Sequence, residues 1–137
     1  MKIERITTFE SFLAVIPLEQ EVREKGREKV KLSKYLELIH NNIENPYFGI
    51  WIAYDEEGIV LGYTIAVAML FPGFERLSLL RMYAIDQETR EALLEILYAW
   101  AKGFRLKKIE ITVYKNAKAI ERKYGYKPVS VNMERRI

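Results

Sequence analysis

The stretch of sequence that decides the fold is residues 48–70, FGIWIAYDEEGIVLGYTIAVAML. Two runs rich in β-branched and aromatic residues, Phe48 to Tyr54 and Ile59 to Leu70, flank the polar segment Asp55-Glu56-Glu57-Gly58. Such runs are typical of strands, and the glycine can adopt the positive φ that a hairpin turn needs. The stretch therefore predicts two antiparallel strands joined by a short turn.

A third strand and a long helix are predicted after this hairpin. The run Leu77 to Ile85 follows a Pro-Gly turn and extends the antiparallel meander. Asp86 is a candidate N-cap for a helix from Gln87 to Lys102, which is apolar nearly all round and stops at Gly103. That helix would lead into a strand from Ile109 to Tyr114 through a right-handed parallel crossover.

The remaining elements flank this central part. Before it we expect a short strand, Met1 to Thr7, a helix from Phe9 to Lys25 that Pro17 breaks near Ile16, and a helix capped by Ser33 and ending near Asn41-Asn42. After it we expect a short helix, Asn116 to Lys123, and a last strand, Val129 to Met133. The order β–α–α–β–β–β–α–β–α–β predicts a single α/β (α+β) domain, residues 1–137, with about four helices and a mixed, mostly antiparallel sheet of about six strands.

The composition excludes several classes of chemistry. The chain has 137 residues, and 50% of them are apolar. The absence of cysteine excludes disulfides, thiolate zinc sites and a cysteine nucleophile, and the single histidine, His40, excludes a multi-histidine metal site. The N-terminal residues alternate charged and apolar types, unlike a signal peptide, and the longest apolar tract falls short of about 20 residues. We expect a soluble, cytoplasmic protein with no membrane contact. Many charged residues and little glutamine are typical of proteins from hot environments.

The net charge of +3 conceals an asymmetry along the chain. Residues 1–100 carry 11 basic and 16 acidic side chains, a net charge of −5, whereas residues 101–137 carry 11 basic and 3 acidic ones, a net charge of +8. A basic C-terminal third can face phosphate groups, nucleic acid or water.

Three local strings, in this order of elements, resemble a known family. The hairpin string Trp51 to Tyr63, the strand end Met82-Tyr83-Ala84 and the turn Gly125-Tyr126-Lys127-Pro128 are similar to strings of the GNAT superfamily of N-acetyltransferases. The resemblance covers essentially the whole chain. It implies a GNAT-like fold in which the fourth and fifth strands splay apart and acetyl-CoA, or another acyl-CoA, enters the gap.

The resemblance also implies where the acyl donor binds. In the family the open edge of the fourth strand holds the pantetheine arm, and a loop rich in Arg and Gly holds the pyrophosphate at the start of the following helix. Mapped onto this sequence, the cofactor-binding candidates are Met82, Tyr83, Ala84, Gln87, Arg90 and Asn116.

The sequence departs from the family at that loop. The stretch from Ile85 to Ala92 contains no glycine and is about four residues short of the usual pattern. It also carries Asp86, Glu88 and Glu91, which would repel phosphate. The alternative interpretation is structural, because an aspartate caps a helix and glutamates favour its positive end.

The catalytic candidates are Tyr124, Glu121 and Glu75. The family often uses a tyrosine of the last helix to protonate the leaving thiolate. Counting back from the Gly-Tyr turn places that acid at Glu121, whereas counting forward from Asn116 places it near Lys123 or Tyr124, and the sequence allows both registers. Glu75 begins the fourth strand, near where some family members carry a base, but an exposed loop carboxylate is the simpler interpretation.

Three functions are compatible with these features. The first is acyl-CoA-dependent transfer of an acetyl group to an amine, whose identity the sequence does not give. The second is a non-catalytic protein-interaction or homodimerisation module that has lost CoA binding, with Phe71, Phe74 or Trp51 at the contact. The third, which we regard as unlikely, is nucleic-acid binding through the basic segment, residues 101–137, where tyrosines alternate with lysines and arginines.

Overall fold

The computed structural model describes residues 1–25, 30–112, 117–129 and 133–136. In chain order the elements are β1 (Lys2–Arg5), α1 (Phe9–Phe12), a 3₁₀ turn (Leu13–Val15), α2 (Ile16–Lys25), α3 (Leu32–Asn42), β2 (Phe48–Tyr54), β3 (Val60–Met69), β4 (Arg76–Ala84), α4 (Gln87–Gly103), β5 (Ile109–Ile111) and α5 (Ala117–Tyr124).

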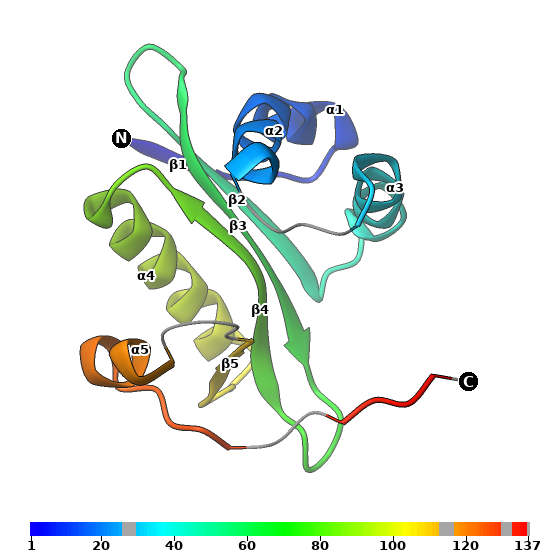
Figure 1. Ribbon diagram of the computed structural model, residues 1–137, viewed down its shortest axis with the longest axis vertical. Helices are drawn as coiled ribbons and strands as arrows, with labels where there is room; N and C mark the ends of the chain where they lie inside the picture. The colour runs from blue at the N-terminus through cyan, green and yellow to red at the C-terminus, as the bar shows by residue number, and fades with distance from the viewer. Residues whose placement is uncertain (26–29, 113–116, 130–132, 137) are drawn as a thin grey trace.

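One sheet with the strand order β1-β2-β3-β4-β5 runs through the molecule (Figure 1). The first four strands pair antiparallel, and the predicted hairpin between β2 and β3 is confirmed, with Gly58 at a φ of 82°. The predicted crossover is also confirmed as parallel, because β5 pairs with β4 in the same direction after α4. These elements give the mixed, mostly antiparallel sheet that the sequence predicts.

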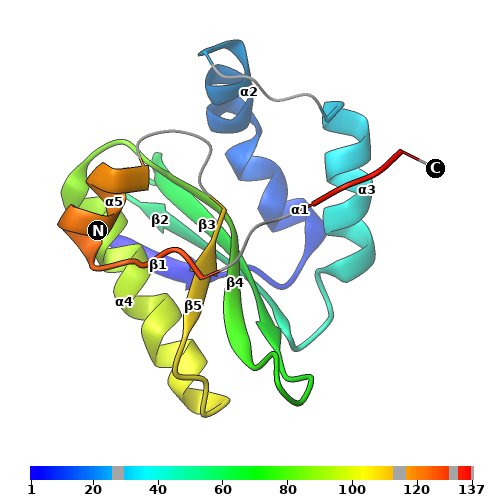
Figure 2. The same ribbon diagram turned by 60° about the horizontal axis from the view of Figure 1, so that its bottom comes forward.

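The helices cover both faces of the sheet (Figures 1 and 2). On one face α1, the 3₁₀ turn and α3 bury Phe12, Val15 and Ile39 against β2 and β3, and we call these elements together with α2 the α1–α3 layer. On the other face α4 buries Leu93 and Leu97 against the same strands, and we call this helix the α4 layer. The sheet is therefore covered by a helical layer on each side.

Several details differ from the prediction. Ser33 is not an N-cap, because it lies inside α3: the helix begins at Leu32, and the cap position is two residues earlier than predicted, at Lys31, which makes no side-chain hydrogen bond. The break near Pro17 is confirmed, because a 3₁₀ turn separates α1 from α2, and the proline lies in the first turn of α2, where its missing N–H costs no hydrogen bond.

The C-terminal third follows the predicted order where the structure describes it, although the strand expected over Ile109 to Tyr114 already ends at Ile111. Five strands lie within the described ranges, and the sixth, expected over Val129 to Met133, falls mainly on residues 130–132, which lie outside them. The helix expected from Asn116 to Lys123 is found as α5, one residue further along the chain, and Asn116 itself is outside the described residues.

Candidate active site

A β-bulge in β4 interrupts its pairing with β3. Ile65 pairs with Arg81, and the next residue, Ala66, pairs with Leu79. Leu80 is therefore an extra residue in β4. The extra residue of a bulge is left out of the ladder of hydrogen bonds, bends its strand, and is common beside active sites.

The bulge reverses the alternation of side chains along β4. Side chains of a strand point alternately to the two faces of a sheet, and one extra residue reverses the order beyond it. Leu79 before the bulge and Met82 after it therefore both pack in the α4 layer. Arg81 and Tyr83 point to the opposite face, where Arg81 reaches Glu19 of α2 and Tyr83 packs against the α1–α3 layer.

The outer edge of β4 is open beyond the bulge. β5 pairs with β4 only at Leu77, Ser78 and Leu79. From Arg81 to Ala84, no strand within the described ranges lies beside this edge. Unpaired N–H and C=O groups on a strand edge can hydrogen-bond an extended ligand in the way that they bond another strand.

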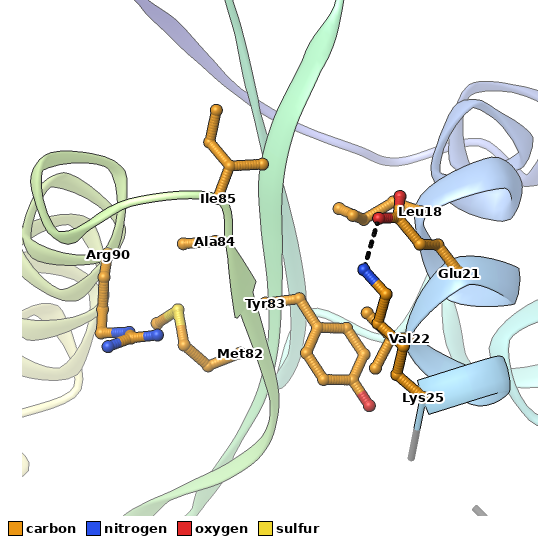
Figure 3. Close-up of a pocket in the computed structure, with 9 residues that line it drawn as sticks. All are labelled: Leu18, Glu21, Val22, Lys25, Met82, Tyr83, Ala84, Ile85 and Arg90. Atoms are coloured by element: carbon orange, nitrogen blue, oxygen red, sulfur yellow. Dashed lines mark hydrogen bonds and ion pairs between the residues drawn. The ribbon is translucent and has the colours of Figure 1, made fainter.

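A first cavity of about 390 Å³ lies at this open edge (Figure 3). Side chains of α2 line one side of it, the end of β4 lies in the middle, and Arg90 of α4 extends from the other side. The lining residues are Leu18, Glu21, Val22, Lys25, Met82, Tyr83, Ala84, Ile85 and Arg90. Four of the six predicted cofactor-binding residues are in this set.

A second cavity of about 440 Å³ lies between β4, β5, α4 and α5. It shares Met82 and Arg90 with the first cavity, and Leu80 of the bulge is part of its wall. The other lining residues are Leu79, Arg81, Leu94, Ile111, Thr112, Ile120, Tyr124 and Tyr126. The two cavities therefore meet at the C-terminal half of β4.

Tyr124 of α5 brings a phenol to the second cavity. Its hydroxyl lies 3.5 Å from Oε1 of Gln87, and Nζ of Lys123 lies 3.5 Å from the same oxygen. The Arg90 guanidinium beside the phenol lowers the pKa of Tyr124 below its ordinary value, because a cationic donor stabilises the phenolate. The structure thus brings three predicted site residues together: Tyr124, Gln87 and Arg90.

The N-terminus of α4 is occupied by the chain itself. Asp86 has extended backbone angles, and its carboxylate accepts a hydrogen bond from the Thr89 N–H at 2.8 Å, which confirms the predicted cap. The hydrogen bonds from Thr89 also lower the pKa of Asp86. Glu91 accepts a hydrogen bond from Gln87 at 2.9 Å, and Glu88 is exposed. The acidic residues of this stretch thus have structural partners or face solvent.

The other predicted site residues lie elsewhere. Glu75 precedes β4 at the opposite end from the cavities, about 23 Å from Met82 along an extended strand. Its carboxylate accepts a hydrogen bond from the Gly73 N–H at 3.1 Å. Glu121 is half-buried on α5 and lines neither cavity, and Asn116 lies outside the described residues.

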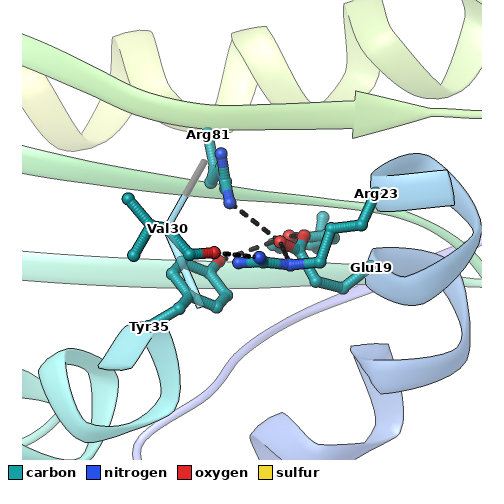
Figure 4. A network of polar contacts seen from close by, with 6 residues as sticks. Glu19, Arg23, Val30, Tyr35 and Arg81 are labelled. Carbon is teal, nitrogen blue, oxygen red and sulfur yellow. Dashed lines mark hydrogen bonds and ion pairs between the residues drawn. The ribbon is translucent and has the colours of Figure 1, made fainter. Parts of the chain in front are cut away.

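A buried polar cluster next to the first cavity was not predicted (Figure 4). The Glu19 side chain is fully buried, and its Oε1 accepts from Arg23 Nε at 2.9 Å and from Arg81 Nη2 at 2.8 Å. The Tyr63 hydroxyl donates to Oε2 of Glu19 and lies 3.3 Å from the Tyr35 hydroxyl. Burial is the main cause of a raised pKa for both tyrosines. The available sequence signal was Arg81, the only charged residue in the run from Leu77 to Ile85.

Two kinds of feature are absent from the described ranges. They contain no group of three or more His, Asp or Glu side chains placed to hold a metal ion. They also contain no helix that is both long and apolar enough to cross a membrane.

Comparisons with known proteins identify the fold. No family model matches the chain, and no curated protein matches its sequence. Solved structures of acetyltransferases do match. One is a predicted acetyltransferase of Clostridium acetobutylicum crystallised with acetyl-CoA, with 19% identity, 98% of this chain and 95% of that chain covered, and a TM-score of 0.72. Another is an aminoglycoside antibiotic 6′-N-acetyltransferase of Acinetobacter baumannii, with 13% identity, 99% and 98% covered, and a TM-score of 0.74.

A third similar structure is an aminoglycoside acetyltransferase from an uncultured soil metagenomic sample, in complex with sisomicin. It is 14% identical, covers 99% of this chain and 95% of its own, and has a TM-score of 0.70. The chain therefore has the fold of these acetyltransferases over its whole length, and the GNAT-like fold implied by the sequence resemblance is confirmed. At these identities the likeness establishes the fold.

Proposed function

We propose that the protein is an acyl-CoA-dependent N-acyltransferase that transfers an acetyl group to an amine by direct attack on the thioester. The observation that carries this proposal is the meeting of the two cavities at the open edge of β4, with the Tyr124 hydroxyl in the second one. A strand edge for an extended arm, a bulge beside it and a proton donor opposite are the parts that this reaction needs.

The chemistry assigns a role to each part. An amine forms a C–N bond with the acyl carbon, the C–S bond breaks, and the nitrogen loses a proton while the thiolate gains one. Tyr124 is the proposed donor of the proton to the thiolate. The lowered pKa of its phenol suits this role, because a lower pKa makes the phenol a stronger acid toward the leaving thiolate. The backbone N–H of Leu80, left out of the ladder, is the proposed hydrogen-bond donor to the developing oxyanion.

The first experiment is a calorimetric titration of the protein with acetyl-CoA, with free CoA and a longer acyl-CoA alongside. We expect saturable binding of acetyl-CoA in the micromolar range. A thiol-release assay with a panel of amines follows. The proposal is wrong if a folded sample, verified by circular dichroism, binds none of the three compounds.

Two substitutions on α5 decide between the catalytic candidates of that helix. Tyr124→Phe should lower kcat about 100-fold, as expected for loss of a general acid, with little change in acetyl-CoA binding. Glu121→Gln serves as the matched variant, since Glu121 lies on the same helix but lines neither cavity, and we expect its kcat to stay close to wild type. The reverse result would assign the acid to Glu121.

A second candidate function is a protein-interaction module. Its support is the turn between β3 and β4, where the side chains of Phe71 and Phe74 are 70% and 57% exposed and contact each other. The earlier suggestion that Trp51 joins such a surface is wrong, since Trp51 is buried between β2 and α4. A light-scattering measurement tests this candidate: a dimer that Phe71→Ser dissociates would support it, and a strict monomer would count against it.

A further inference from the structure

Two cations from different helices face the first cavity. Lys25 is the last residue of α2, and Arg90 lies in the second turn of α4. Figure 3 shows them on opposite sides of the end of β4, with Met82 and Tyr83 between them. The lining has one acidic residue, Glu21, whose Oε1 lies 3.1 Å from Lys25 Nζ. The described lining therefore has a net positive charge.

The first turn of α4 lacks the glycine-rich backbone that commonly holds a phosphate group. Helix N-termini bind phosphates through free backbone N–H groups, and glycines let the backbone approach closely. Here the Asp86 carboxylate takes the Thr89 N–H, and the stretch from Ile85 to Ala92 has no glycine. A doubly charged phosphate ligand at this place would therefore depend on nearby cationic side chains more than it does where a glycine-rich loop is present.

We propose that Lys25 and Arg90 hold the diphosphate of the acyl donor between them, in place of a glycine-rich loop. This inference rests on the proposed function. The extended edge from Leu80 to Ile85 is about 17 Å long, so a donor whose thioester lies beside Tyr124 in the second cavity extends into the first cavity with its diphosphate end. Arg90 lines both cavities and is placed to contact the donor at this junction.

Glu21 opposes this binding, so removal of its charge should have the opposite effect to removal of the Lys25 charge. The side chains of Lys25 and Glu21 are 76% and 59% exposed, and exposed pairs of this kind contribute little to stability. A diphosphate can therefore replace Glu21 as the partner of Lys25. Removal of the Glu21 charge frees Lys25 and removes repulsion, so it should strengthen donor binding, whereas removal of the Lys25 charge should weaken it.

The test compares two ligands and four variants by calorimetry. Acetyl-CoA carries the diphosphate, and S-acetylpantetheine lacks it but keeps the thioester and the arm. For acetyl-CoA we expect Kd to rise about tenfold in Arg90→Gln and about fivefold in Lys25→Gln, and to fall about threefold in Glu21→Gln. The control is Lys102→Gln, because Lys102 is an exposed residue of α4 about 18 Å along the helix from Arg90, and its Kd should not change.

The outcomes separate this inference from the proposed function. None of the variants should change the Kd of S-acetylpantetheine by more than about twofold, since that ligand carries no diphosphate. Wild-type affinity for acetyl-CoA in both Lys25→Gln and Glu21→Gln, or equal effects on both ligands, would overturn the inference while leaving acyl transfer intact. If wild type binds no acyl donor, inorganic pyrophosphate is the probe. Binding that Lys25→Gln weakens then supports the anion site without acyl transfer, and no binding refutes it.

Discussion

The two helical layers are attached to the same sheet by different interactions. In the α1–α3 layer, Glu19 of α2 is fully buried and is bonded to Arg23, Arg81 and Tyr63. The buried contact of the α4 layer is apolar and aromatic apart from Thr89, and Trp51 meets Trp100 edge to face with ring centroids 5.0 Å apart. Both layers therefore bury apolar side chains against the sheet, and the α1–α3 layer adds directional bonds to a buried charge.

The charged contacts and the apolar contacts position the walls of the site in different ways. Hydrogen bonds to a charged group have narrow geometry, so the Glu19 contacts fix how α2 lies relative to β4, and α2 supplies one side of the first cavity. Apolar packing has no preferred direction and derives its precision from close fit. We therefore expect the α1–α3 layer to be sensitive to charge and pH, and the α4 layer to be sensitive to volume.

The largest expected effect is on the charged cluster. Glu19→Gln keeps the shape of the side chain but leaves two arginine side chains that are only 14% and 18% exposed without their carboxylate, so we expect the unfolding free energy to fall by about 3–5 kcal/mol. Urea denaturation measures the change. Glu24→Gln, on the exposed side of the same helix, is the matched control and should be close to neutral. A loss below about 1 kcal/mol for Glu19→Gln would end the contrast between the layers.

The next effect tests the fit of the α4 layer. A Cβ at Gly49 would lie 2.3 Å and 2.5 Å from ring atoms of Trp51 and 3.2 Å from Trp100. Gly49→Ala should therefore cost about 1–3 kcal/mol through overpacking, as measured by urea denaturation. Gly103→Ala adds the same methyl group where nothing lies within 4 Å, and we expect no loss of stability there. Equal effects of the two changes would show that the indole pair adapts freely.

A third effect concerns alkaline pH. Burial raises the pKa of Tyr63 far above its ordinary value of 10.0. Below about pH 10 both the folded and the unfolded protein keep this proton. Above it only the unfolded chain releases the proton, so the stability should fall by about 1.4 kcal/mol per pH unit for this group. Urea unfolding at pH 9.5 and 11 measures the slope. Tyr63→Phe should remove this contribution of about 1.4 kcal/mol per pH unit from the slope. An unchanged slope would contradict this account.

The smallest expected effect is at the start of α4. Asp86→Ala removes the cap of Thr89, so the urea midpoint should decrease slightly at pH 7. The lowered pKa of Asp86 means that the carboxylate stabilises the folded state above the unfolded pKa of about 3.8, and this contribution disappears as the pH falls through the lower folded value. The variant and the wild type should therefore become equally stable in strong acid. A midpoint difference that persists there would contradict the prediction.

Features that depend on neighbouring residues could be predicted from the sequence. The hairpin between β2 and β3 follows from Gly58, and the start of α4 follows from Asp86, since each signal acts within four residues. The start of α3 was misplaced because Ser33 is a good capping residue by type, but the helix already begins at Leu32. A local preference decides an element only where the surrounding structure does not override it.

Features that depend on distant residues could not be predicted. The run from Leu77 to Ile85 has only two strongly polar residues, Ser78 and Arg81, and two positions are too few to predict the bulge at Leu80. Glu19 lies in a charged stretch that is typical of an exposed helix, and its partner Arg81 is 62 residues away. The sequence left both Tyr124 and Glu121 as candidates, and only the packing of α5 against α4 places Tyr124 at the second cavity.

The bulge at Leu80 decides which face of the sheet each following side chain of β4 occupies. Each side chain from Arg81 to Ala84 lies on its present face of the sheet because Leu80 has no partner in β3. If Leu80 instead took a regular place in the ladder, Arg81 would turn toward the apolar helix and Met82 toward the buried carboxylate of Glu19, although no residue had been replaced. The bulge therefore brings Arg81 to Glu19 and Met82 to α4, and deletion of Leu80 alone should keep both side chains on their present faces, because Arg81 would then follow Leu79 as a direct neighbour in the ladder.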